Sequence, residues 1–139
     1  WNLDERAVID MGDFSGALLK YVRAHPLPRL TIAGGFGKLS KLADGHMDLH
    51  SSRSSVDIAG LARRLARCGA TSETVAEAQA AVSAGGVLVV AARVGLSDEL
   101  CRDVALASRE VCRAALGGAA DVDVLVVARD GEVLAHVDA

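Results

Sequence analysis

Residues 29–43, RLTIAGGFGKLSKLA, decide the fold because they predict a strand, a glycine turn and a helix in direct succession. The apolar and β-branched residues 29–33 favour a strand, and the helix is expected from about Lys38 to Ala43. Glycines between a strand and a helix let a ligand approach the backbone closely, and the free N–H groups at the helix start attract negative charge. The stretch therefore predicts an α/β fold with an anion site at this turn.

The rest of the chain predicts four more helices and two C-terminal strands. The helices are expected over residues 14–24, 56–68, 74–84 and 97–116. Their start signals are, in order, Asp10 or Asp13, Ser54 or Ser55, a capping box of Thr74 and Glu77, and Ser97-Asp98-Glu99. The strands are expected over 122–127 and 133–137, joined by an Arg129-Asp130-Gly131 turn.

Two segments complete the predicted layout. Residues 6–9 look like a short strand, whereas residues 85–92 fit a buried strand and a helix equally well, because β-branched residues follow a glycine pair. Together the elements predict a Rossmann-like layered α/β domain with a largely parallel sheet and a C-terminal β-hairpin.

The composition suits one small domain. The 139 residues are 51% hydrophobic and 3% aromatic, so Ala, Val and Leu must fill the core and aromatic platforms for stacking bases are not expected. The formal net charge of −3 offers no overall basic surface for nucleic acid or an anionic membrane. Any anion site must therefore be local.

Cysteine usage and hydropathy favour a cytoplasmic protein. The three cysteines form no C-x-x-C pair and are expected to be buried, reduced thiols. The uncharged run from Ala78 to Ala92 is too short for a membrane-spanning helix, and no signal peptide opens the chain. Because the sequence begins at Trp1 and runs almost at once into an apolar segment, we expect it to be part of a longer protein.

Residues 34–53 concentrate cationic groups in this acidic chain. Lys38 and Lys41 lie three positions apart on one helical face, and the polar loop 45–55 that follows contains His46, His50 and Arg53. These groups predict an anion site beside the glycine turn. A tight turn with surface lysines would give the same pattern, so that alternative stays open.

Generic catalytic and nucleotide-binding motifs do not fit. A P-loop needs Ser or Thr after its lysine, but Leu39 follows Lys38, and the dinucleotide pattern has Ser40 at its third glycine position. His46 and His50 have no third ligand beside them, so no metal site is expected. Asp13 fits a helix cap better than a general base. The residues alone identify no catalytic group.

Three strings resemble a known family. GDFSGAL at 12–18, IAGGFGKLSKLA at 32–43 and Met47-x-x-His50-Ser51 are similar to the C-terminal half of the CbiD family, the cobalt-precorrin-5B C1-methyltransferases of cobalamin biosynthesis. The resemblance spans most of the chain, but family members are longer. It therefore implies that residues 1–139 are a single α/β domain matching the C-terminal part of CbiD, without the N-terminal domain.

The match to the family pattern is close but has two departures. Gly35 stands where the family usually has His, and Leu49 stands where it has Thr. The matching positions are Gly34, Gly37, Lys38, Lys41, His50 and Ser51.

The resemblance implies transfer of a methyl group from S-adenosylmethionine to ring carbon C1 of a cobalt-bearing polycarboxylate tetrapyrrole, a reaction governed by positioning. For the cofactor it implies Gly34, Gly35, Gly37 and Lys38. For the corrinoid substrate it implies Asp13, Lys41, His50, Ser51 and Arg53. It assigns no catalytic residue. The N-terminal domain of the same enzyme is an implied partner, and a homo-oligomer remains open.

Two other functions compete with this one. Gly35 and Leu49 favour a non-catalytic ligand-binding or scaffolding domain that retains the CbiD fold. A generic nucleotide-binding module is disfavoured by Leu39 after Lys38. Binding of S-adenosylmethionine and of a corrinoid separates the first alternative from the methyltransferase.

Overall fold

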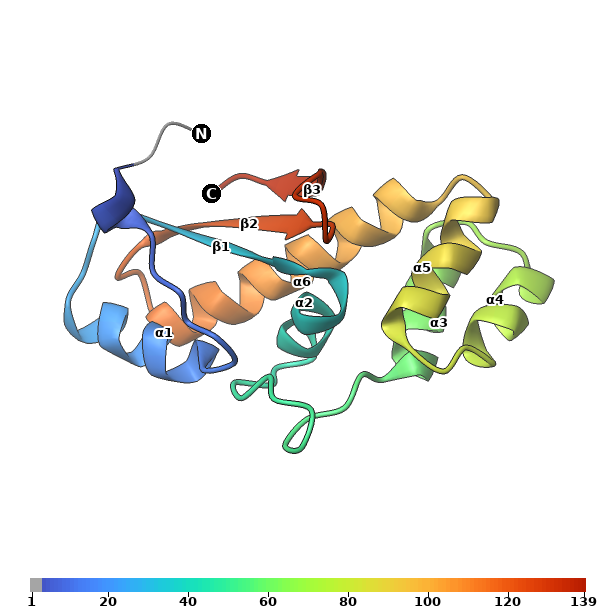
Figure 1. Cartoon of the computed structure of the whole chain (residues 1–139), viewed down its shortest axis with the longest axis horizontal. Helices are drawn as coiled ribbons and strands as arrows, with labels where there is room; N and C mark the ends of the chain where they lie inside the picture. The colour runs from blue at the N-terminus through green and yellow to red at the C-terminus, as the bar shows by residue number, and fades with distance from the viewer. Residues whose placement is uncertain (1–3) are drawn as a thin grey trace.

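The computed structural model describes residues 4–139 and shows an α/β fold (Figure 1). A 3-10 turn at Glu5–Ala7 comes first. The helices are α1 (Ser15–Ala24), α2 (Phe36–Ala43), α3 (Ile58–Arg67), α4 (Ser72–Gln79), α5 (Ala84–Arg93) and α6 (Ser97–Leu116). The strands are β1 (Arg29–Gly35), β2 (Asp121–Val127) and β3 (Val133–Val137). The first three residues of the predicted 1–139 domain lie outside the described range.

The sheet is mixed and has the order β1-β2-β3. β1 and β2 are parallel, with Ile32 opposite Val124, while β2 and β3 are antiparallel, with Val124 opposite Val137. The prediction of a largely parallel sheet was therefore wrong. Two segments explain the difference, because the expected strand at 6–9 overlaps the 3-10 turn and forms no strand, and the ambiguous segment 85–92 is helical.

The core lies between one face of the sheet and the helices. Val122, Val124 and Val126 alternate along β2 and are buried together with Ile32 of β1. α6 contacts β2 and β3, and α1 and α2 pack along α6. Figure 1 shows these three helices on the same side of the sheet. The alternation of small apolar residues along β2 thus directs one face of the sheet toward the helices.

The helices α3, α4 and α5 form a second region beside α2 and α6 (Figure 1). Segment 85–92 is helical because Val87, Val90 and Ala91 recur at helical spacing and are buried. The Ser83 side chain caps α5 by accepting a hydrogen bond from Gly86 N at 3.1 Å. The glycine pair falls in the first turn of α5.

Several predicted helix starts lie elsewhere. α3 is capped by Asp57, which accepts from Gly60 N at 2.8 Å, rather than by Ser54 or Ser55. α4 begins earlier than the Thr74–Glu77 capping box predicted, because Thr71 supplies the cap. α1 begins after Phe14 without a side-chain cap, so neither Asp10 nor Asp13 has the expected role.

Among residues 4–139, no helix combines the length and the apolar character needed to span a membrane.

Candidate functional site

A cavity of about 1040 Å³ lies at the carboxyl ends of the parallel strands β1 and β2. Its walls are the first turn of α2, residues 9–13, residues 49–51, the start of α5 and the turn after β2. This is the edge of an α/β sheet where ligands bind. Eight of the predicted site residues line it: Asp13, Gly34, Gly35, Gly37, Lys38, Lys41, His50 and Ser51.

The start of α2 presents open backbone to this cavity. Gly35 is the N-cap, and no side chain of the described residues accepts a hydrogen bond from the first N–H groups of the helix. Gly34, Gly35 and Gly37 all have ordinary backbone φ angles. A Cβ at Gly37 would come no closer than 3.6 Å to a neighbouring atom, the Cβ of Ala84. The fold therefore does not require glycine at position 37, whereas close approach of a ligand would.

Asp13 and Lys38 form an ion pair at the cavity, with 3.0 Å between Lys38 Nζ and Asp13 Oδ1. The Lys38 side chain is 54% exposed, so the pair contributes below about 1 kcal/mol to stability. Its main effect is to place a cation and a carboxylate beside the start of α2. Asp13 thus pairs with α2 instead of capping α1.

The polar loop after α2 is tied to the start of α1. Met47 O accepts hydrogen bonds from Gly16 N and Ser15 Oγ, both at 2.9 Å, and Leu49 N donates to Asp13 O at 2.8 Å. A Cβ at Gly16 would lie 2.8 Å from Met47 Cβ, so this glycine is required by close packing. The two sequence strings 12–18 and 47–51 therefore hold each other in place.

Lys41 is a buried cation at the same cavity. Lys41 is 8% exposed, and its Nζ donates a hydrogen bond to Leu49 O at 2.9 Å. Among residues 4–139, no carboxylate lies within ion-pair distance of it. A buried ammonium without a countercharge is costly, so Lys41 is suited to meeting an anion in the cavity.

The predicted loop residues are not all brought together. His50 is exposed, and its Nδ1 lies 2.8 Å from Ser52 Oγ. Arg53 is absent from the cavity lining and lies 3.7 Å from Asp48. His46 is also exposed. The loop therefore contributes His50 and Ser51 to the cavity wall, while Arg53 forms an ion pair with Asp48 at the surface.

The structure adds lining groups that the sequence did not identify. The start of α5 contributes Ser83 and Gly85, and the turn after β2 contributes Arg129. The Gly85-Gly86 pair was a signal for the start of α5. It could be placed at the cavity only once residues 85–92 were known to be helical. Arg129 carried only a turn signal, since its place beside α2 depends on the pairing of β1 with β2.

A different polar cluster occupies the amino ends of β1 and β2. Asp123 is fully buried, and its carboxylate accepts hydrogen bonds from Arg29 at 2.8 Å, from Thr31 Oγ1 at 3.0 Å and from Ala139 N at 3.0 Å. Burial alone would raise the pKa of Asp123, but these hydrogen bonds outweigh it and hold the pKa below its usual value. The cluster thus clamps the two parallel strands to the chain after β3.

The same cluster contains the one set of metal-type ligands within residues 4–139, namely Asp123, His136 and Asp138. Asp123 already accepts from a guanidinium, a hydroxyl and a backbone N–H, which leaves its oxygens engaged. The arrangement is therefore suited to holding strands together rather than to holding a metal ion.

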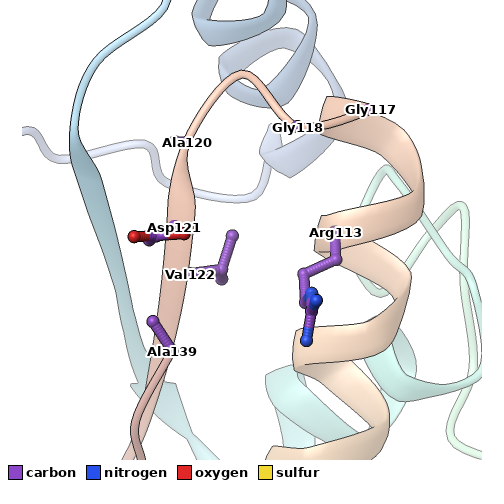
Figure 2. Close-up of a pocket in the computed structure, with 7 residues that line it drawn as sticks. All are labelled: Arg113, Gly117, Gly118, Ala120, Asp121, Val122 and Ala139. Atoms are coloured by element: carbon purple, nitrogen blue, oxygen red, sulfur yellow. The ribbon is translucent and has the colours of Figure 1, made fainter.

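A smaller hollow of about 400 Å³ lies between the end of α6 and the start of β2 (Figure 2). Figure 2 shows the Arg113 side chain reaching from α6 toward β2 and Val122 pointing toward α6, while Asp121 points away. None of the predicted site residues lines it. The polar groups do not converge there, so the larger cavity is the candidate site.

The cysteines offer no activated nucleophile. Cys101 and Cys112 are buried, as predicted, and burial raises the pKa of each thiol to about 11, with the Asp98 carboxylate adding to the effect at Cys101. Cys68 is only half-buried, and burial also raises its pKa. These thiols are protonated at neutral pH.

A cavity at the carboxyl ends of parallel strands, beside an uncapped helix start with open glycine backbone, defines a ligand-binding α/β domain. Comparison with known proteins makes this class specific. Residues 48–138 match the family model described as CbiD, C-terminal domain. The chain belongs to this family.

Several named relatives extend the match over nearly the whole chain. A cobalt-precorrin-5B C(1)-methyltransferase from Rhodospirillum rubrum is 58% identical over 95% of the chain and 37% of the relative's length. Proteins with that name from Paramagnetospirillum magneticum and Brucella ovis are 49% and 44% identical, over 95% and 99% of the chain and 36% and 37% of their own lengths. The chain thus spans little more than a third of these relatives. No solved structure matches.

Proposed function

We propose that this chain is the C-terminal part of a cobalt-precorrin-5B C1-methyltransferase, and that the cavity at the ends of β1 and β2 binds its reactants. One observation carries the proposal. Residues 12–18, 32–43 and 47–51, the strings that resemble the family, converge on one cavity of about 1040 Å³. That volume is at the upper end of the range for small-molecule sites, ~300–1,000 Å³.

The cofactor in this proposal is S-adenosylmethionine, placed at Gly34, Gly35, Gly37 and Lys38. The open backbone at Gly37, where a Cβ would fit without a clash, supports a ligand lying directly against the chain. The free N–H groups of α2 and the Lys38 ammonium suit the carboxylate of the cofactor. The position at the carboxyl end of a parallel strand also supports the Rossmann-like description of the fold.

The corrinoid substrate is placed at Asp13, Lys41, His50 and Ser51. Lys41 supports this assignment best, because its buried ammonium has no carboxylate partner among residues 4–139. An acidic side chain of the macrocycle would supply the missing charge. Arg53 belongs to the same loop, but its pairing with Asp48 makes it the weakest member of the predicted set.

The chemistry asked of these residues is positioning. S-adenosylmethionine supplies an electrophilic methyl group, a bond forms between that carbon and ring carbon C1, and the sulfur–methyl bond breaks to leave S-adenosylhomocysteine. Such a transfer needs an in-line approach of the two reactants. The residues of the chain bind and orient both molecules. The remaining part of the enzyme, an N-terminal domain in the cytoplasm, is proposed to complete the site.

A non-catalytic binding or scaffolding domain is the second candidate. It is favoured by Gly35 and Leu49, which lack the polar side chains usual at these family positions. Leu49 is 2% exposed and uses its backbone N–H and C=O to join α2 to the segment before α1. A leucine here therefore retains the architecture of the cavity without adding a polar contact.

The test is binding of S-adenosylmethionine to the complete protein and to its Gly37→Ala variant, measured by titration calorimetry. The added methyl group occupies space that the ligand needs, so we expect the dissociation constant to rise about tenfold. The fold should be unchanged or slightly more stable, by up to about 1 kcal/mol, because alanine favours helix.

Gly86→Ala is the control in the first turn of α5, because Gly86 lies outside the cavity lining. Its Cβ would lie 3.2 Å from Ala81 Cβ, so folding of this variant is checked by chemical denaturation. We expect it to leave the affinity within about twofold. Failure of the unmodified protein to bind S-adenosylmethionine would refute the cofactor assignment. Binding of a corrinoid without methyl transfer by the complete enzyme would favour the scaffolding alternative.

A further inference from the structure

Arg129 is a cationic residue of the cavity lining that no carboxylate in the described part of the chain neutralises. It belongs to the turn between β2 and β3, two residues beyond Val127, which pairs with Gly35 at the end of β1. The residue is exposed, and it forms no hydrogen bond or ion pair with any residue in the range 4–139. The parallel pairing of β1 and β2 thus brings Arg129 into the lining of the cavity, on the same edge of the sheet as the start of α2.

Lys41 is the second cation of the cavity without a carboxylate partner. It comes from α2, and among residues 4–139 only the carbonyl of Leu49 accepts from its ammonium. The carboxylates in the lining are engaged elsewhere, because Asp13 pairs with Lys38 and Asp10 accepts from Gly12 N at 2.9 Å. Two cationic residues from separate elements therefore line one cavity, and neither has a carboxylate partner among residues 4–139.

We infer that Arg129 binds a peripheral carboxylate of the substrate while Lys41 binds another, so that the cavity selects a ligand with at least two carboxylates. This inference rests on the proposed function, since it concerns the corrinoid placed in the same cavity. The planar guanidinium can hold a carboxylate through two parallel hydrogen bonds, which fixes its direction as well as its charge. Arg129 thus determines specificity for the free acid over an amide.

The experiment compares two probes on the complete protein. One is a corrinoid with free peripheral carboxylates, cobyrinic acid, and the other is the same corrinoid with those groups amidated. Dissociation constants are measured by titration for the unmodified protein, for Arg129→Gln and for Arg102→Gln. Arg102 is an exposed arginine on α6 that lies outside the cavity lining and has no partner among the described residues, so it controls for loss of surface charge.

We expect Arg129→Gln to weaken binding of the free acid about tenfold and to leave binding of the amidated corrinoid unchanged. Arg102→Gln should change neither. Arg129→Lys should restore part of the affinity for the free acid, since it keeps the charge and loses the paired hydrogen bonds.

Three outcomes overturn the inference. Equal affinity of Arg129→Gln and the unmodified protein for the free acid would show that Arg129 does not contact a carboxylate, while leaving the proposed function intact. An equal loss for both probes would show that Arg129 acts on the shape of the cavity. Failure of the unmodified protein to bind either corrinoid would remove the proposed substrate together with this inference.

Discussion

The polar groups at the two ends of the parallel pair β1–β2 differ in how far they are hydrogen-bonded within the protein. At the amino ends, Asp123 is fully buried and accepts hydrogen bonds from Arg29, Thr31 and the backbone of Ala139. At the carboxyl ends, α2 begins without a side-chain cap and Arg129 has no partner among residues 4–139. Satisfied polar groups hold a fold together, whereas unsatisfied groups at a cavity are available to a ligand.

The arginines of the two ends show the same contrast. Arg29 uses Nε and Nη2 on the two oxygens of one buried carboxylate, each at 2.8 Å. Arg129 belongs to a turn at the other end of β2 and lines the large cavity. Substitutions at the amino ends should therefore change stability without changing ligand affinity, and substitutions at the carboxyl ends should do the reverse.

The largest expected effect is that of Asp123→Asn. An amide cannot accept from Arg29, Thr31 and Ala139 N as the buried carboxylate does, so we expect a loss of about 2 kcal/mol in the free energy of unfolding. The affinity for S-adenosylmethionine should stay within about twofold of the unmodified protein when both are folded. Chemical denaturation and titration calorimetry measure the two quantities. A large loss of affinity for S-adenosylmethionine with unchanged stability would contradict the structural role of Asp123 at the amino ends of β1 and β2.

The stability difference between the unmodified protein and Asp123→Asn should also depend on pH, in a direction that the depressed pKa of Asp123 sets. The pKa of Asp123 is depressed in the folded protein, so its ion pair stabilises the fold at pH values above the usual carboxyl pKa of about 3.9. That stabilisation is lost as the pH falls through the folded pKa. The stability difference between the unmodified protein and Asp123→Asn should therefore be full near pH 7 and shrink below about pH 4. A difference that grows on acidification would show that the sign is wrong.

Local patterns in the sequence were sufficient for the succession of β1 and α2 within residues 29–43, but not for the boundary between them. Gly34 and Gly35 belong to β1 and Gly37 belongs to α2, which begins at Phe36 instead of about Lys38, so no separate glycine turn lies between the two elements. The helix over 97–116 was equally well specified, since Gly117 ends α6 with a φ of +59° that favours glycine. For these elements, periodicity and end signals agree with the tertiary packing.

Long-range pairing could not be inferred in the same way. Arg29 and Asp123 are 94 positions apart, and nothing in either local sequence indicates the bond between them. Segment 85–92 was ambiguous because its β-branched residues after a glycine pair favour a strand while its neighbours are helical. The structure has it as α5, in which Val87 and Val90 are buried. Arg129 could be placed in the cavity only after the register of β1 and β2 was known.

Hydrogen exchange at the start of α2 would show whether the unsatisfied backbone at this end of the sheet binds the cofactor. Amide exchange of residues 35–38 would be measured in the complete protein with and without S-adenosylmethionine. We expect slower exchange at these amides on binding and no change at Gly86, whose N–H already donates to Ser83 Oγ, or at residues 121–123. Slowing at another segment with no change at residues 35–38 would contradict it.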